Sequence, residues 1–225
     1  MNLYREGYRS VQGIVGPLLM VSGVREAGFG EKVLIETPDG KRTGQVLQVD
    51  GDLCAIQVFE GTMGLYSGGT TVWLERDIVR MPVGLSLLGR VLDGRGRPAD
   101  GKPLGFIEKT LPVNGLPLNP VARTSPNSFV ETGISTIDLM NTLVRGQKLP
   151  IFSGAGLPAN RLASQIVRQS RVPGKETSFI VVFAAIGITA RESREFLDDF
   201  EKTGALNNGV FFINLASDSA VERLL

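Results

Sequence analysis

The stretch LPIFSGAGLPANRLASQIVRQS (149–170) decides the fold that this 225-residue sequence predicts. It begins with a short apolar run (149–152), continues through a glycine-containing turn (153–160) and ends in a pattern with apolar residues on one helical face. Strand, glycine turn and helix in this order form a phosphate-binding loop, whose template is G-x-x-x-x-G-K-[ST]. The stretch therefore predicts a short buried strand that leads into a loop of the nucleotide-binding kind.

Four positions of the turn depart from that template. Ser153 and Pro158 stand where the two glycines belong. Ala159 replaces the lysine, and Asn160 replaces the hydroxyl residue that binds magnesium. Proline has no backbone N–H, and a hydrogen bond to a charged group is worth roughly 1.5–3 kcal/mol, so losing the lysine weakens binding about 10- to 100-fold. We therefore expect the shape of a phosphate loop without the charge stabilisation that phosphoryl transfer needs.

The rest of the turn keeps the backbone part of the design. Amides beside a helix N-terminus attract an anion, and the run GAG (154–156) lets the backbone approach closely. Arg161 is the nearest cation, and two interpretations stay open: a partial substitute for the lysine, or a solvent-facing helix residue. We identify no catalytic residue and no metal ligand. The candidate nucleotide-binding residues are Ser153, Gly154, Ala155, Gly156, Leu157, Pro158, Ala159, Asn160 and Arg161.

Downstream of the loop, strand patterns alternate with helix patterns. Apolar runs at 178–186 and 210–216 predict strands, the first of them covered on both faces. The run TARESREFLDDFEKTGA (189–205) between them predicts an amphipathic helix. This alternation indicates a doubly wound parallel sheet like that of P-loop NTPases. Asp218 is the closest candidate for a magnesium-organising aspartate, but it lies too far past its strand to serve.

The first third of the chain has a different pattern. From about residue 8 to residue 75, short apolar or alternating runs are separated by turn signals. The pairs Asp39-Gly40 and Asp50-Gly51 lie between β-branched runs and predict tight hairpins. Several short strands with this spacing favour a small antiparallel β-barrel. The predicted fold class is thus α/β, with an N-terminal all-β barrel and a partial, P-loop-NTPase-like parallel sheet after it.

A connector rich in glycine and proline joins the two patterns. It runs from about 76 to 135 and ends at a short predicted helix capped by Ser135 or Thr136. The predicted organisation is a barrel over 1–75 and a connector with a nucleotide-binding α/β domain over 76–225. Four scattered arginines are interpreted as solvated surface or an intersubunit rim rather than as a phosphate patch. They are Arg90, Arg95, Arg97 and Arg123.

Composition excludes several classes of function. The chain has no histidine, which rules out Ser-His-Asp hydrolysis and histidine-ligated zinc. The net charge is +1, so there is no broad electrostatic footprint for nucleic acid or an acidic membrane. Cys54, the single cysteine, lies in an apolar run and is expected to be a buried structural thiol. No run approaches the ~20 apolar residues of a membrane span, and the N-terminus lacks a signal segment, so we expect a cytosolic protein.

Long motifs make a specific resemblance. The run ETGISTIDLMNTLVRGQKLPIFSGAGLPANR (131–161) closely resembles the B subunit of archaeal and bacterial V-type (A-type) rotary ATPases. The runs NGLPLNPVAR (114–123), VVFAAIGIT (181–189) and NLASDSAVER (214–223) are similar to the same family. The resemblance extends from near residue 8 to the last residue.

This resemblance implies a non-catalytic, regulatory and structural subunit. In that family, B subunits alternate with catalytic A subunits in a hexameric ring around a rotating central stalk, with peripheral stalk subunits as further partners. It also implies that ATP or ADP is bound weakly if at all, and that Mg²⁺ is held only through the catalytic partner. The complex is a proton- or sodium-translocating ATPase or ATP synthase on the cytoplasmic face of the membrane, which this subunit meets only indirectly.

The chain is expected to be an N-terminal portion of such a subunit. It ends after three predicted sheet strands, whereas chains of that family continue through further strands and a helical C-terminal domain. Two alternatives stay open: a weak ATPase with a degenerate loop, and a ring-shaped nucleic-acid motor. The motor is disfavoured by the near-zero net charge and by the absence of aromatics clustered with lysine or arginine on the barrel strands.

Overall fold

The computed structural model describes residues 6–115, 117–174 and 179–225. These residues form two compact units. Among them, the first unit contains residues 6–83, 109–115 and 216–225, and the second contains residues 84–108, 117–174 and 179–215.

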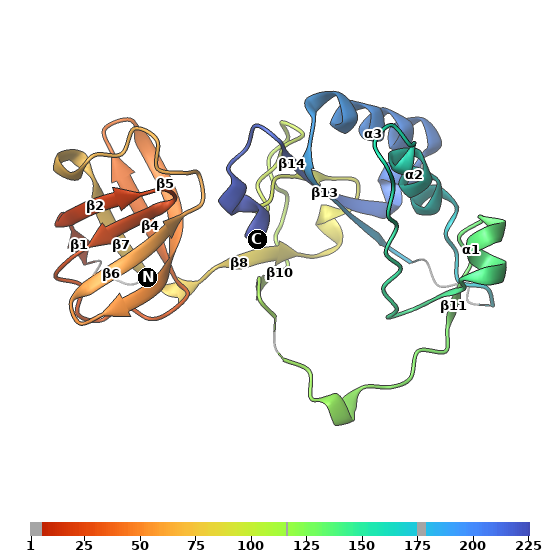
Figure 1. Cartoon of the computed structure of the whole chain (residues 1–225), viewed down its shortest axis with the longest axis horizontal. Helices are drawn as coiled ribbons and strands as arrows, with labels where there is room; N and C mark the ends of the chain where they lie inside the picture. The colour runs from red at the N-terminus through yellow and green to blue at the C-terminus, as the bar shows by residue number, and fades with distance from the viewer. Residues whose placement is uncertain (1–5, 116, 175–178) are drawn as a thin grey trace. The chain divides into compact units, whose positions relative to one another are not determined.

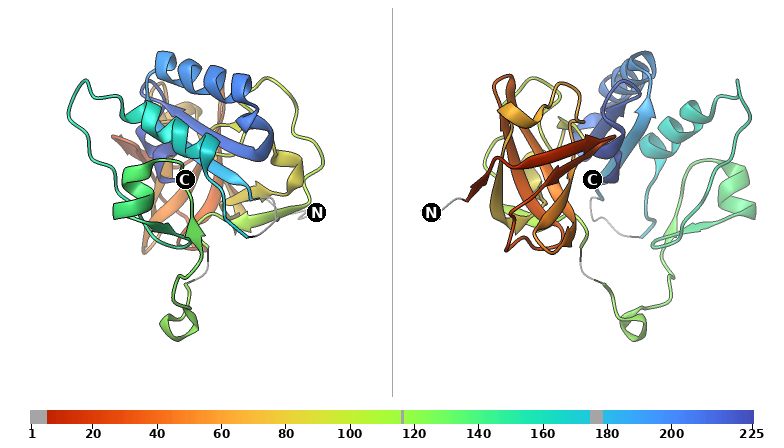
Figure 2. Two further views of the ribbon diagram at one scale, coloured as in Figure 1. Left: turned by 90° about the vertical axis from the view of Figure 1, so that its right-hand side faces the viewer. Right: turned by 60° about the vertical axis from the view of Figure 1, so that its left-hand side comes forward.

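The first unit is built around a seven-stranded antiparallel sheet that curls on itself (Figures 1 and 2). Its strand order is β1-β7-β4-β5-β6-β3-β2. The predicted N-terminal barrel is therefore confirmed as a strongly curled sheet, although no hydrogen-bonded pairing joins its end strands within the described residues. The strands are β1 (Gly7–Tyr8), β2 (Val11–Val15), β3 (Leu18–Val21), β4 (Glu31–Thr37), β5 (Gly40–Asp50), β6 (Leu53–Val58) and β7 (Thr71–Ile78).

Both predicted hairpins form. In the first, Thr37 pairs with Gly40, so the two turn residues lie one position earlier than the Asp-Gly pair itself. In the second, Asp50 pairs with Leu53, and Gly51 takes a left-handed φ of 60° in the turn. Two-residue turns set the register of their strands, and register decides which side chains face inward.

Alternate residues of the curled sheet are fully buried. Cys54 lies among them with 0% of its surface exposed, and burial raises the pKa of its thiol to about 11. The expected structural thiol is thus confirmed as buried, and its raised pKa keeps it in the unreactive thiol form. The core of this unit consists of Leu19, Val21, Val24, Val33, Ile35, Val46, Cys54, Ile56, Val58, Leu65, Val72 and Leu74.

The connector contributes short elements to both units. In the first unit, β8 (Arg80–Val83) pairs antiparallel with β10 (Lys109–Pro112). The last described residues form a short 3₁₀ helix, η5 (Ala220–Leu224). The remaining turns of 3₁₀ helix are η1 (Ser67–Gly69), η2 (Leu85–Leu87), η3 (Pro120–Ala122) and η4 (Ala205–Asn208).

The second unit contains the predicted parallel sheet, with the strand order β13-β14-β9. The sheet consists of β13 (Val181–Ile188), β14 (Gly209–Leu215) and β9 (Val91–Leu92), and both pairings are parallel. The third strand therefore comes from the connector, where no sheet strand was expected. Residue 178, the first of the predicted strand 178–186, lies outside the described residues.

The buried strand expected at 149–152 does not form. These residues are coil, and the side chains of Ile151 and Phe152 are 45% and 92% exposed. An apolar run becomes a strand only where a neighbouring strand pairs with it, and no described strand pairs with this run. Pro150 also removes a backbone donor that such a pairing would use.

Helix α3 (Ala190–Thr203) lies across one face of the parallel sheet (Figure 2). Phe196 and Phe200, four residues apart on this helix, form one aromatic cluster with Phe183 of β13 and Phe211 of β14, at ring-centroid distances of 5.0–6.1 Å. Gly204 ends the helix with a left-handed φ of 73°. The amphipathic helix is therefore confirmed, and it holds β13 and β14 through one aromatic cluster.

The prediction that the first strand is covered on both faces is wrong. Ala185 of β13 is 5% exposed, whereas Val182 and Ile186 are 67% and 59% exposed. The continuous apolar sequence predicted two buried faces, but the described elements cover one of them.

The short helix α1 (Ser135–Met140) forms, but neither Ser135 nor Thr136 caps it. Instead, the Asp138 carboxylate reaches back and accepts hydrogen bonds from the Thr132 amide (2.9 Å), the Thr132 hydroxyl (2.7 Å) and the Gly133 amide (3.0 Å). These donors, the Thr132 amide first, lower the pKa of Asp138. The helix lies between β11 (Phe129–Val130) and β12 (Leu143–Val144), which pair with each other.

Arg90 is not a solvated surface residue. Its guanidinium binds both oxygens of Asp100, at 2.6 and 3.0 Å, and donates to the carbonyl of Lys102 at 2.8 Å. The two side chains are only 13% and 14% exposed. The interpretation as solvated surface is therefore wrong for this arginine, which instead anchors the connector beside β9.

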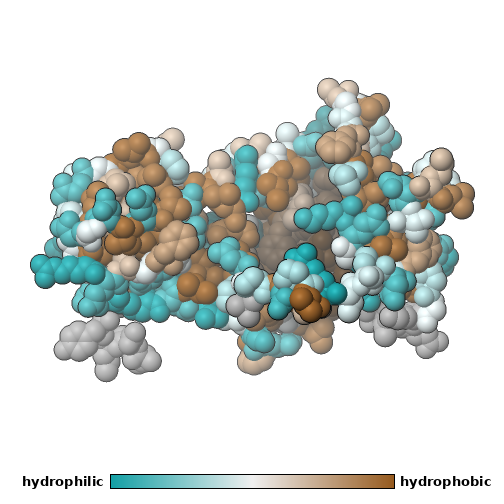
Figure 3. All heavy atoms as spheres, turned by 60° about the horizontal axis from the view of Figure 1, so that its bottom comes forward, coloured by the Kyte–Doolittle hydropathy of each residue, from teal (hydrophilic) through white to brown (hydrophobic). Residues whose placement is uncertain are grey.

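Within the described ranges, no helix is both long and apolar enough to cross a lipid bilayer. Figure 3 shows hydrophilic and hydrophobic residues interspersed over the face that it presents.

Candidate functional site

The candidate phosphate loop is an exposed turn that leads into helix α2 (Ala159–Gln169). Gly156 adopts a left-handed φ of 84°, which only glycine takes without strain. The Leu157 amide donates to the Gly154 carbonyl at 3.3 Å and closes the turn. All of the candidate residues 153–161 are exposed except Ala159, which is half-buried.

Part of the loop backbone is already used within the turn. The Ala159 amide donates to the Leu157 carbonyl at 2.9 Å, and the Arg161 amide donates to the Pro158 carbonyl at 3.1 Å. Within the described residues, the amides of Gly154, Ala155 and Gly156 have no hydrogen-bond acceptor. Three backbone donors beside a helix N-terminus are thus left to bind an anion.

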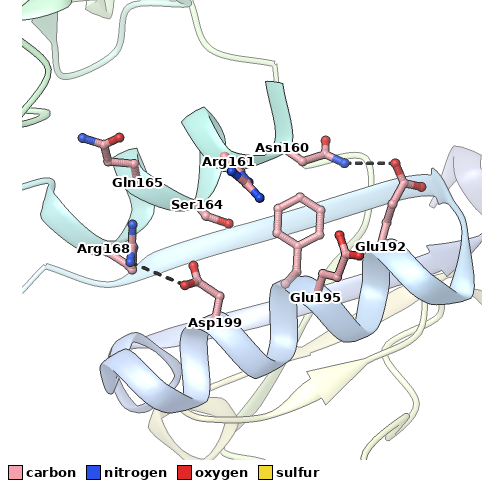
Figure 4. Close-up of a pocket in the computed structure, with 9 residues that line it drawn as sticks. Asn160, Arg161, Ser164, Gln165, Arg168, Glu192, Glu195 and Asp199 are labelled. Atoms are coloured by element: carbon pink, nitrogen blue, oxygen red, sulfur yellow. Dashed lines mark hydrogen bonds and ion pairs between the residues drawn. The ribbon is translucent and has the colours of Figure 1, made fainter. Parts of the chain in front are cut away.

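Asn160 occupies the position of the template's magnesium-binding hydroxyl, and its side chain has a structural partner. Its Nδ2 donates to Glu192 Oε1 at 3.0 Å, a bond that links α2 to the first turn of α3 (Figure 4). The other oxygen of Glu192 accepts from the amide and the hydroxyl of Thr189, both at 2.8 Å, in a capping box. The Thr189 amide, with smaller contributions from the other two donors, lowers the pKa of Glu192. This carboxylate is therefore held ionised and occupied, which does not suit a general base.

A polar groove of about 440 Å³ lies between α2 and α3. Arg168 of α2 forms an ion pair with Asp199 of α3 at 3.4 Å (Figure 4). Phe196, which also lines the groove, is buried. Arg161 is exposed and also lines this groove. The groove is lined by Asn160, Arg161, Ser164, Gln165, Arg168, Glu192, Glu195, Phe196 and Asp199.

No metal-organising group accompanies the loop in the described parts of the chain. These parts contain no cluster of three or more histidine, cysteine, aspartate or glutamate side chains that could hold a metal ion. Asp218 lies three residues past the end of β14 and belongs to the first compact unit, whereas the loop belongs to the second. The arrangement can therefore offer backbone donors to phosphate, but it brings no lysine, hydroxyl or carboxylate to a metal.

Sequence reasoning missed two parts of this site. The link from Asn160 to Glu192 depends on the capping box, and the pattern Thr-x-x-Glu at 189–192 is its sequence signature. The buried position of Ser164 in the groove has no comparable signal, because it depends on how α2 packs against α3.

Comparison with known proteins bears on both units. Residues 11–73 match the beta-barrel domain of the ATP synthase alpha/beta family, and residues 133–225 match the nucleotide-binding domain of the same family. The chain is also 52% identical over 219 residues to the B subunit of the A-type ATP synthase of Methanopyrus kandleri. That match covers 97% of the chain and 22% of the relative, so the chain spans about a fifth of the relative's length.

The two matched regions coincide with the two architectures that the structure shows. Residues 11–73 include β2 to β6 and the start of β7 but not β1, and residues 133–225 include the loop, α2, β13, α3 and β14. A curled antiparallel sheet followed by a partial parallel sheet with a phosphate-type loop is thus what this chain shares with its relatives. The chain belongs to the ATP synthase alpha/beta family.

Proposed function

We propose that this chain acts as the non-catalytic B subunit of a V/A-type ATP synthase or ATPase, with a structural and regulatory role. The observation that carries the proposal is the loop itself: Ala159 offers no charge, and Asn160 is engaged with Glu192. The match to the B subunit of an A-type ATP synthase supports the choice of subunit.

The partners of the proposed subunit follow from the family. It alternates with a catalytic A subunit in a hexameric ring and contacts central and peripheral stalk subunits. The complex moves protons or sodium ions and lies on the cytoplasmic face of the membrane. In this proposal, 1–75 is the barrel domain, and 76–225 holds the connector and the nucleotide-binding domain.

This loop offers groups that could bind only the phosphates of a nucleotide. The free amides of Gly154, Ala155 and Gly156 and the N-terminus of α2 would hold a phosphate of ATP or ADP. No described residue at the loop is placed to bind Mg²⁺, so the proposal assigns the metal to the catalytic partner. Binding through backbone dipoles alone is weak, because no side-chain cation reaches the terminal phosphates.

Hydrolysis assays test the proposal. The purified chain, with and without Mg²⁺, should show no ATP turnover above that of a Gly156→Ala variant. That substitution places a side chain at a left-handed φ and so distorts the loop. A stoichiometric complex with a catalytic A-type subunit should hydrolyse ATP at a rate that the same variant leaves nearly unchanged. Mg²⁺-dependent turnover by the chain alone, abolished by Gly156→Ala, would instead establish a weak ATPase.

A further inference from the structure

An irregular segment of the α/β unit, residues 117–128, forms an arc with a hollow along it. Figures 1 and 2 show the segment (green) extending away from the parallel sheet, with η3 at its far end. The hollow has a volume of about 780 Å³, and its lining includes Leu118, Ala122, Arg123, Ser125 and Arg145. Long irregular connections are uncommon in compact domains, and those that occur are often functional. The arc is therefore a candidate binding surface.

Backbone hydrogen bonds fix the positions of the two arginines that line this hollow. The Arg123 amide donates to the Pro120 carbonyl at 3.2 Å, at the end of η3. The Arg145 amide donates to the Ser128 carbonyl at 2.9 Å, directly beside the pairing of β11 with β12. A surface whose backbone is already ordered loses less entropy when it binds a partner.

The positive charge of the hollow is not compensated by the chain itself. Among the described residues, its lining contains two arginines and no carboxylate. Other arginines of the same unit, such as Arg90, Arg168 and Arg171, pair with a carboxylate. The guanidinium groups of Arg123 and Arg145 form no hydrogen bond or ion pair with any residue in 6–115, 117–174 and 179–225. Two unmatched guanidinium groups in one hollow suit carboxylate ligands.

Exposed apolar side chains accompany the two arginines. Leu118 lines the hollow and is 60% exposed, and Val121 of η3 is 91% exposed. An inorganic ion would leave both side chains in water. A protein segment that carries apolar residues beside its carboxylates would cover them and also match the charge.

We propose that the 117–128 arc, together with Arg145, docks an acidic segment of a partner protein in which apolar residues lie beside the carboxylates. Each guanidinium can donate two parallel N–H bonds to one carboxylate. The hollow of about 780 Å³ has room for several side chains of such a segment. The surface does not include residues 153–161, so this inference is independent of nucleotide binding at the loop.

Titration of the whole chain with a synthetic peptide tests the proposal. The probe is a short peptide in which glutamate alternates with leucine, and the control peptide has glutamine in place of every glutamate. Backbone amide NMR signals are followed at constant ionic strength. The acidic peptide should produce saturable shifts confined to residues 117–128 and the turn at 145–146, and the glutamine peptide should produce none.

Substitutions locate the binding to the two arginines. Arg123→Gln and Arg145→Gln should each weaken binding of the acidic peptide about 10- to 100-fold, because each removes a charged donor. Leu118→Ala should weaken it by a smaller factor. The matched control is Arg194→Gln, which removes the same charge from an exposed residue of α3 in the same unit and should leave binding unchanged. Far-ultraviolet circular dichroism confirms that each variant is folded before it is titrated.

Several results would overturn the proposal. The absence of saturable shifts, or equal binding of the glutamine peptide, would show that the arc does not select carboxylates. Equal weakening by Arg123→Gln, Arg145→Gln and Arg194→Gln would mean that the peptide responds only to net charge. Shifts of the same signals when the chain is concentrated without peptide would assign the arc to a second copy of this chain. Tighter binding of a single-stranded oligouridine than of the acidic peptide would assign it to nucleic acid.

Discussion

The curled sheet and the α/β unit differ in how completely each buries its own apolar side chains. In the curled sheet, Val33, Ile35 and Val72 have no exposed surface, and every strand except the end strands β1 and β2 has neighbours on both sides. In the α/β unit, Val182 and Ile186 of β13 are more than half exposed, and the apolar run before the loop is coil. Apolar sequence therefore produces a core only where the chain also supplies the surface that covers it.

The largest expected contrast between the two units concerns single apolar truncations. Ile56→Ala, at a position with no exposed surface, should lower the free energy of unfolding of the curled sheet by about 2–5 kcal/mol. Val182→Ala removes a mostly exposed side chain and should change the stability of the α/β unit by less than about 0.5 kcal/mol. Urea unfolding followed by hydrogen exchange of each unit measures both. A loss above about 2 kcal/mol for Val182→Ala would mean that this face of β13 is covered in solution.

The sequence predicts the curled sheet better than it predicts the α/β unit. The hairpins of the curled sheet depend on neighbours close in sequence, so Asp39-Gly40 and Asp50-Gly51 were sufficient to predict them. The parallel sheet joins residues that are far apart, and β9 pairs with β14 across more than a hundred residues. No local pattern at Val91–Leu92 distinguishes a sheet strand from connector, because two residues are too few to show a period.

The candidate site shows the same division. The absence of lysine and hydroxyl at the loop can be read directly from residues 159 and 160. The shape of the loop cannot be read from the sequence, because it depends on which carbonyls accept hydrogen bonds from the Leu157 and Ala159 amides. The role of Arg161 was left open between two interpretations, since a helical position alone does not show which neighbouring helix the side chain will face.

A second contrast concerns how the stability of each unit changes in acid. The curled sheet has an apolar core, whereas the connector in the α/β unit is anchored by the Arg90–Asp100 pair, which holds the pKa of Asp100 far below its usual range. A depressed pKa stabilises the fold above the unfolded pKa of about 3.9 and ceases to do so as the pH falls through the folded value. Asp100→Asn should therefore destabilise the α/β unit by about 1–3 kcal/mol at pH 7. The cost should shrink below pH 4, and the curled sheet should be unaffected at either pH.

Hydrogen exchange at pH 7 and at about pH 2, well below the unfolded pKa, measures this effect for each unit separately. Lys102→Gln is a suitable control, because the backbone carbonyl of residue 102, not its side chain, accepts from Arg90. Equal losses at the two pH values would show that Asp100 stabilises the connector through packing rather than charge.

A third prediction concerns the loop. Pro158→Gly, Ala159→Lys and Asn160→Thr together restore the template's second glycine, its charge and its hydroxyl. ADP binding should tighten about 10- to 100-fold, which corresponds to roughly 1.4–2.7 kcal/mol. Calorimetric titration measures the gain, and Ala159→Gln in the same background separates the charge of the lysine from its length. No gain in affinity would mean that residues 153–160 are not shaped as a phosphate loop.

The smallest expected effect concerns the link between the two helices of the groove. The pKa of Glu192 is lowered first by the Thr189 amide, then by the Thr189 hydroxyl, and only then by Asn160. Asn160→Ala removes the weakest of these three donors. The pKa of Glu192 should therefore rise slightly and still lie below its ordinary value of about 4.3, because both Thr189 donors remain.

Carbon-13 NMR titration of the Glu192 carboxyl measures that shift. Gln165→Ala is the matched control, because this groove amide donates to Gln169 and not to Glu192. Any stability lost by Asn160→Ala should appear above pH 4 and vanish in stronger acid, since a protonated Glu192 no longer gains from the donor. An unchanged pKa would show that the 3.0 Å contact does not persist in solution. The loop of the α/β unit would then be held only by its own turn, whereas the strands of the curled sheet are held by their neighbours.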